Sequence, residues 1–166
     1  MSTSTATLVL VGEGPWLDEN EGRAWRSLMA MHADLALYLE RQLRARNGLS
    51  RADFEVLALL SEAADGRLRM FELGAALRWE KSRLSQHLTR MEGRGLVARE
   101  ACPTDQRGAV AVLTPQGREV IEAAAAPHAA DVRAVLIDHV TPEQLDVLRE
   151  LGDLVRSRVG ALESES

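Results

Sequence analysis

The spacing of apolar residues changes at about residue 95, and this change limits the chain to few folds. Before it, residues 70–77 and 81–94 follow the three- and four-residue step of short amphipathic helices. After it, residues 96–101 and 109–113 are short β-prone runs. Two helices followed directly by two strands predict a helix-turn-helix with a β-hairpin behind it, which is the winged form of that motif.

The connections and the buried face of this unit can also be predicted. Residues 78–80 form the turn between the two helices. In the second helix, Leu84, Leu88 and Met91 are spaced i, i+4 and i+7, which indicates one buried stripe. Residues 102–108 contain a Pro and a Gly and join the two strands, so we expect a loop too long for a tight two-residue turn.

The remaining segments are predicted to be helical, with recognisable starts. Ser50 and Asp53 resemble a capping box, and Thr114 and Thr141 each precede a proline at the first helical position. Pro127 should kink the helix that Thr114 opens, or force it to restart. We expect these helices over residues 19–46, 50–64, 115–139 and 142–159.

Composition excludes several other classes of protein. Apolar residues make up 46% of the chain but aromatic residues only 4%, and the abundance of Ala and Leu favours helices over an all-β fold. Cys102 is the only cysteine, so an intramolecular disulfide is impossible and a cysteine-based zinc site is effectively excluded. No apolar stretch approaches membrane-spanning length and no signal peptide is visible, so we expect a cytoplasmic protein that binds no membrane.

Charge is distributed unevenly. The chain carries a net charge of −5, which argues at first against nucleic acid as a partner. Residues 67–107, however, hold nine basic residues against five acidic ones, a net charge of +4 that leaves −9 for the remainder. A basic segment in an acidic body is expected where one face meets phosphates.

The helix over residues 81–94 carries polar side chains opposite its buried stripe, and these side-chain types suit the major groove of DNA. Gln can pair with adenine, Arg with guanine, and Ser or Thr with base edges or phosphate. The first helical turn also offers free backbone N–H groups to a phosphate. A long cation in the hairpin loop, Arg107, could enter a minor groove. The predicted DNA-binding residues are Lys81, Ser82, Arg83, Ser85, Gln86, Thr89, Arg90 and Arg107.

Four stretches together resemble the MarR family of transcriptional regulators. Residues 77–97 look like the family's recognition helix, ending in a Glu-x-x-Gly-Leu-Val signature, and Asp105-Gln-Arg-Gly108 resembles its Asp-x-Arg wing motif. Residues 113–117 resemble the Leu-Thr-x-x-Gly that follows the wing, and residues 49–57 are similar to the opening of the second helix. The resemblance covers roughly residues 20–160. One departure is Glu80, at a position where Ser or Thr is more usual.

The resemblance implies a mainly α fold with a small β-hairpin, a winged helix-turn-helix with N- and C-terminal dimerisation helices. We divide the chain into an irregular arm (1–18), a helical dimerisation region (19–48 and 115–160) and a DNA-binding lobe (49–114). A homodimer of this kind would bind a pseudo-palindromic operator, with half-sites about one helical turn apart. It would act as a repressor released by a small molecule or another signal. Asp105 would orient Arg107 rather than touch DNA.

Other functional sites find little support. Trp25, Met29 and His32 could line an effector pocket, although helix packing is the more ordinary role for each of them. Cys102 is taken as a bystander thiol rather than a redox sensor, because no His or second Cys adjoins it. The histidines are too scattered for a metal site, no cofactor motif is present and no catalytic set is recognisable, so we expect no enzyme. The alternative function is a winged-helix module that binds protein rather than DNA.

Overall fold

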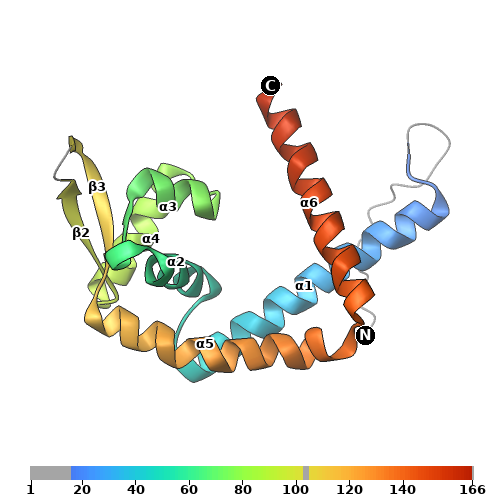
Figure 1. The fold of residues 1–166 in the computed structure, drawn as a ribbon, viewed down its shortest axis with the longest axis horizontal. Coiled ribbons are helices and arrows are strands. Elements are labelled where there is room, and N and C mark those ends of the chain that lie inside the picture. The colour runs from blue at the N-terminus through green and yellow to red at the C-terminus, as the bar shows by residue number, and fades with distance from the viewer. Residues whose placement is uncertain (1–15, 103–104, 166) are drawn as a thin grey trace, which may run out of the picture.

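The structure is a computed structural model that describes residues 16–102 and 105–165. The compact lobe in Figure 1 contains α2, α3, α4 and the sheet, while α5 leads away from it alongside α1 and ends where α6 turns back. The elements are α1 (Glu19–Asn47), α2 (Arg51–Glu62), β1 (Arg67–Arg69), α3 (Met70–Leu77), α4 (Lys81–Gly93), β2 (Val97–Cys102), β3 (Asp105–Leu113), α5 (Pro115–Val135) and α6 (Pro142–Ser164).

Three of the helices, α2, α5 and α6, begin at the predicted caps. The side chains of Ser50 and Asp53 form a reciprocal capping box on α2, and Thr141 forms one with Gln144 on α6. The Thr114 hydroxyl accepts from the third amide of α5. Each of these caps satisfies backbone N–H groups that the first helical turn leaves unpaired. Most of the predicted irregular arm, residues 1–15, lies outside the described residues.

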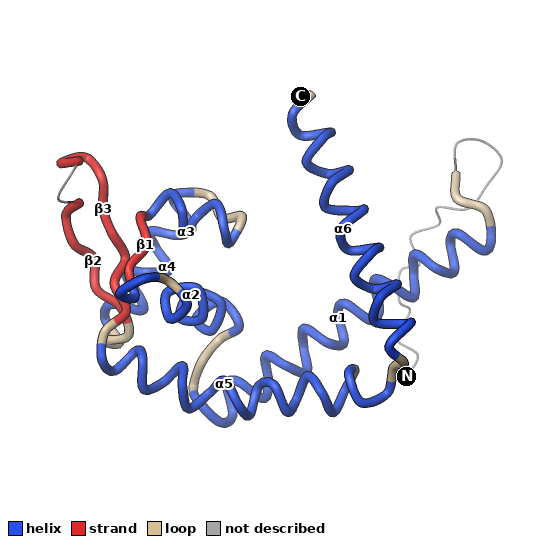
Figure 2. The backbone as a smooth tube through the Cα atoms, in the orientation of Figure 1, coloured by secondary structure: helices blue, strands red, loops and turns tan. Residues whose placement is uncertain are grey.

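The sheet has one strand more than predicted. Its order is β1-β3-β2, with both pairs antiparallel, and β1 aligns Arg67 with Val112 and Arg69 with Val110. Figure 2 shows the three strands together at the outer end of the lobe. The short β1 has no period of its own to reveal it, and it forms because β3 offers a free edge.

The prediction of a long hairpin loop is wrong. Cys102 pairs with Asp105, so only residues 103–104 connect the two strands, and these lie outside the described residues. Arg107 therefore belongs to β3 and not to a loop. Ala101 pairs with Ala109, which leaves residues 106–108 as an irregularity in the β3 side of the ladder. Apolar spacing did not predict this extension of the strand, because residues 105–108 are Asp, Gln, Arg and Gly and backbone pairing does not depend on apolar alternation.

Two helix ends also differ from expectation. α2 ends at Glu62 rather than near residue 64, and α5 ends at Val135, with a separate 3₁₀ turn at Ile137–His139. Pro127 lies inside α5 without ending it, so of the two predicted outcomes, a kink or a restart, the restart does not occur. Contacts of α5 with α1 and α2 hold the helix in place, and tertiary packing of this kind can outweigh the roughly 3 kcal/mol that an interior proline costs.

The hydrophobic core lies in the lobe. Leu84, Leu88 and Met91 of α4 are at most 1% exposed, which confirms the predicted buried stripe. They pack with apolar residues of α2, α3 and the sheet, and the cluster extends to Leu43 of α1 and Ile121 of α5. α6 is the opposite case, because none of its residues is buried. Within the described ranges, no helix is both long enough and apolar enough to cross a membrane.

Candidate nucleic-acid interface

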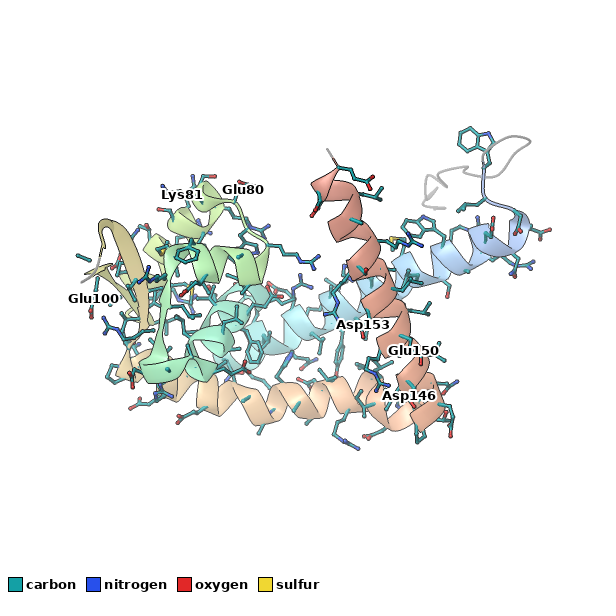
Figure 3. All side chains as sticks on the ribbon, turned by 45° about the horizontal axis from the view of Figure 1, so that its top comes forward. Glu80, Lys81, Glu100, Asp146, Glu150 and Asp153 are labelled. Atoms are coloured by element: carbon teal, nitrogen blue, oxygen red, sulfur yellow. The ribbon has the colours of Figure 1, made fainter. Side chains whose placement is uncertain are left out.

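Helix α4 presents a polar face to solvent because its apolar stripe is fixed in the core. Its exposed residues include most of those predicted from the sequence, namely Lys81, Ser82, Arg83, Gln86, Thr89 and Arg90, while Ser85 is half-buried. Figure 3 shows Glu80 and Lys81 where α4 begins, on the side of the lobe away from α5. Glu80 makes no side-chain cap, so the first turn keeps free backbone donors beside the lysine.

The two arginines on this face are held by aromatic rings. The guanidinium of Arg83 lies 4.4 Å from the ring centre of Trp79 in a cation–π contact. Nη2 of Arg90 donates to Nδ1 of His87 at 3.0 Å. His87 itself meets Trp79 edge to face, with ring centres 5.1 Å apart. Both cations therefore leave the helix in defined directions.

The wing is attached to α4 by ion pairs. Glu92, in the last turn of α4, accepts from the backbone N–H of Arg99 in β2 at 3.2 Å and from its guanidinium at 2.7 and 3.1 Å. This hydrogen bonding by Arg99 lowers the pKa of Glu92. Across the sheet, Arg67 pairs with Glu100. The side chain of the proposed minor-groove residue, Arg107, lies outside the described ones.

Arg94, the C-cap residue of α4, binds the C-terminal end of this helix to neighbouring elements. Its guanidinium donates to Asp53 Oδ2 and to the carbonyl of Gly48, both at 2.8 Å. Three basic residues of the positive segment thus form ion pairs with carboxylates of the same chain, namely Arg67, Arg94 and Arg99. Glu92 and Glu100 are already counted in the net charge of +4, so of these three pairs only that of Arg94 with Asp53, which lies outside the segment, reduces the positive charge that is available to DNA.

Comparison with known proteins identifies the architecture. A profile of the MarR family matches residues 47–108. The structure superposes on AbsC, a MarR family transcriptional regulator from Streptomyces coelicolor, with a TM-score of 0.86 and 38% identity over 89% of this chain and 99% of that one. The chain belongs to the MarR family. Sco3205, a MarR family transcriptional regulator from the same organism solved in complex with DNA, matches with a TM-score of 0.84 and 38% identity over 88% of this chain and 91% of that one. The HTH-type transcriptional repressor YetL of Bacillus subtilis is 30% identical over 66% of each chain.

Membership of the MarR family makes this chain a DNA-binding transcriptional regulator and not an enzyme. The structure also explains two glycines of the family-like signatures. Gly95 has a φ of +71°, which side chains disfavour, and a Cβ at Gly117 would lie 2.0 Å from the carbonyl oxygen of Leu96. In the described part of the chain, no group of three or more His, Cys, Asp or Glu could hold a metal ion.

The sequence did not reveal one group of residues on the buried side of α4 in this MarR-type lobe. His87 of α4 is only 8% exposed, and Asp53 of α2 is only 5% exposed. The two face each other, with Nε2 and Oδ1 3.0 Å apart, in a mainly electrostatic contact. Burial opposes the ionisation of Asp53, but hydrogen bonds from Ser50 and Arg94 hold its pKa below the ordinary 3.8.

A cavity of about 980 Å³ lies between the helices of the MarR lobe and the end of α1. Phe54 and Trp79 contribute aromatic surface to it, and Arg83, His87 and Arg90 reach it from α4. The suggested effector residues do not line this cavity; Trp25, Met29 and His32 are exposed on α1.

Proposed function

We propose that the chain is a homodimeric repressor that binds a pseudo-palindromic operator and leaves it when a small molecule binds. The observation that supports this most is the exposed face of α4, where Lys81, Arg83, Gln86 and Arg90 project from a helix whose other side is locked in the core. Such a helix can enter the major groove without rearrangement.

Within this proposal the predicted readers have different roles. Gln86 and Arg90 suit base edges, since Gln pairs with adenine and Arg with guanine in bidentate fashion. Lys81 and Ser82 lie in the first turn, where they suit a phosphate. Ser85 is half-buried and Thr89 donates its hydroxyl to the carbonyl of Ser85 at 2.9 Å, so these two would act as acceptors or packing groups. Arg107 would reach the minor groove from the wing, oriented by Asp105.

The second half of the proposal, a homodimer, is supported by large apolar side chains that are exposed to solvent in the single chain. A helix of 23 residues with no buried side chain gains little from packing within its own chain, although helices in proteins depend mainly on packing of an apolar face. α1 also exposes Trp25, Leu28 and Leu37. A second copy of the chain would cover both surfaces. The exposed apolar residues of α6 are Val147, Leu148, Leu151, Leu154, Val155, Val159 and Leu162.

The domain division follows from the same surfaces. Residues 49–114 form the lobe that would bind DNA, and residues 19–48 and 115–160 form the helical frame that would join two copies. The frame would set the distance between half-sites at about one helical turn, roughly 34 Å. A regulator of this kind works on the chromosome, and we place it in the cytoplasm.

Release by a small molecule is supported by the cavity behind α4. The cavity is open to solvent, and an occupant would contact Arg83, His87 and Arg90, which stand on or behind the proposed DNA-reading face. A thermal-shift screen of metabolites against the purified protein tests this, because a bound ligand raises the melting temperature by mass action. If no class of metabolite raises it, release by a small molecule loses its support.

A gel-shift titration against the DNA upstream of the chain's own gene, over a series of salt concentrations, tests the DNA half of the proposal. We expect retarded complexes that survive competitor DNA, with an affinity that falls as salt rises. Arg107→Ala should weaken binding to all sequences, whereas Gln86→Ala should relax preference at one base position. Binding with no preference over random DNA would contradict the proposal.

A further inference from the structure

The imidazole of His87 is an unusual group for the buried side of a helix. Its neighbours along that side, Leu84, Leu88 and Met91, are apolar and at most 1% exposed, while His87 is 8% exposed. A buried polar ring is costly unless its nitrogens have partners. The contacts of the two ring nitrogens therefore indicate the role of His87.

Both arginines on the exposed face of α4 are connected to the His87 ring by contacts. Arg90 donates to Nδ1 at 3.0 Å, so the lone pair of Nδ1 is directed at the guanidinium. The ring edge meets Trp79, and the face of Trp79 holds Arg83 at 4.4 Å. One buried side chain thus contacts one arginine directly and the other through a single aromatic ring.

The surroundings of His87 keep that lone pair available. Because Nδ1 accepts, the neutral ring carries its proton on Nε2, which faces Asp53 of α2. The charged groups that face the ring are Asp53 from α2 and Arg83 and Arg90 from α4, and Trp79 adds no charge. Burial lowers the pKa of His87, and the attraction of Asp53 offsets this only in part. Protonation would place an N–H on Nδ1, against the guanidinium of Arg90.

We infer that His87 is a positioning residue for DNA recognition, which sets Arg90 directly and Arg83 through Trp79 in the orientation that meets the operator. This inference rests on the proposed function. An arginine side chain loses much rotamer freedom when it binds, and a guanidinium that is already held loses less. Holding both arginines from behind therefore strengthens binding without adding a contact to DNA.

A double-mutant cycle between His87→Leu and Arg90→Ala tests this, with leucine chosen because it suits a buried position. The probe is the duplex that the parent chain enriches most strongly from a random-sequence library. We expect His87→Leu and Arg90→Ala each to weaken binding by about tenfold, the loss of one hydrogen bond to a charged group. The double variant should bind no more than about threefold worse than Arg90→Ala, because the histidine then acts only indirectly, on Arg83 through Trp79.

Losses that multiply to roughly a hundredfold would show independent roles and overturn the inference. His87→Asn keeps an acceptor near Nδ1 and should recover most of the parental affinity, a recovery that a merely space-filling role does not predict. His139→Asn, at an exposed histidine beyond α5, is the matched control and should bind like the parent. If the parent enriches no sequence at all, the proposed function fails; if it does so and the cycle is multiplicative, only the inference fails.

The pH dependence of binding provides a readout that does not depend on how well His87→Leu folds. As pH falls below the ordinary histidine value of 6.5, the parent should lose affinity relative to His87→Asn, because a protonated ring repels Arg90. The ratio of the two affinities should be constant above that value. A ratio that does not change between pH 7.5 and about 5 would also overturn the inference.

Discussion

Replacing Gly117 by alanine tests how tightly the wing is joined to the helical frame. A Cβ at this position would lie 2.0 Å from the carbonyl oxygen of Leu96 and 2.9 Å from Cδ1 of Leu113. The oxygen belongs to the backbone, so α5 must move away from the wing by about 1 Å or more to reach an ordinary contact distance. Leu96 is also the acceptor for the N–H of Thr114 at 3.3 Å and for its hydroxyl at 3.0 Å.

The expected loss follows from these contacts. Overpacking costs about 1–3 kcal/mol, and two weakened hydrogen bonds add about 1 kcal/mol each. Alanine returns about 1 kcal/mol through its higher helix propensity, so the net loss is about 3 kcal/mol. For a chain of this length, that lowers the melting temperature by roughly 6–12 °C.

Differential scanning calorimetry at one fixed protein concentration measures this loss. Gly93→Ala is the matched control, because Gly93 also lies in a helix, α4, and a Cβ there meets nothing within 4 Å. Its melting temperature should stay the same or rise slightly. If Gly117→Ala melts within 2 °C of the parent, about 1 kcal/mol or less, the junction is looser than the structure indicates.

Three further predictions concern the buried pair, pH and the dimer. Asp53→Ala should destabilise the chain by about 3 kcal/mol in urea unfolding, since it removes acceptors of a backbone amide and a guanidinium; a loss under about 1 kcal/mol would contradict the network. Burial lowers the pKa of His87 and of His128, so the unfolded chain takes up protons first. Stability should therefore fall as pH drops from about 6.5 through the lower pKa values of the two histidines in the folded chain. A variant with Asn at both positions should show a flatter pH profile of stability in thermal melts. Leu151→Glu should convert dimers to monomers in sedimentation analysis, while Arg149→Ala, also on α6, should leave them intact; dimers in both would place the interface elsewhere.

The predictable parts of the fold are those that local chemistry dictates. The caps at Ser50, Thr114 and Thr141 and the stripe of Leu84 and its neighbours each depend on residues a few positions apart, and all are confirmed. β1 and the extension of β3 were missed because backbone pairing across the sheet leaves no periodic trace in short or polar segments.

Only the exposed residues of the candidate site could be predicted from the sequence. Lys81, Arg83, Gln86 and Arg90 follow from helical geometry once the buried stripe is known. The role of His87 depends on Asp53, which lies on a different helix, so no local pattern could reveal it. Asp53 is also far from Arg94 in the sequence. A count of charges along residues 67–107 therefore could not show that Arg94 forms an ion pair with it.

Selection of duplexes from a random-sequence library by the purified chain tests the central claim most directly, namely that α4 reads DNA sequence. The account predicts enrichment of an inverted repeat whose half-sites are centred about 10 base pairs apart, or one helical turn. Gln86→Ala should lose preference at one position in each half-site and keep the repeat. An unenriched pool after selection with the parent chain, or the same motif at full strength with Gln86→Ala, Arg83→Ala and Arg90→Ala, would contradict the claim.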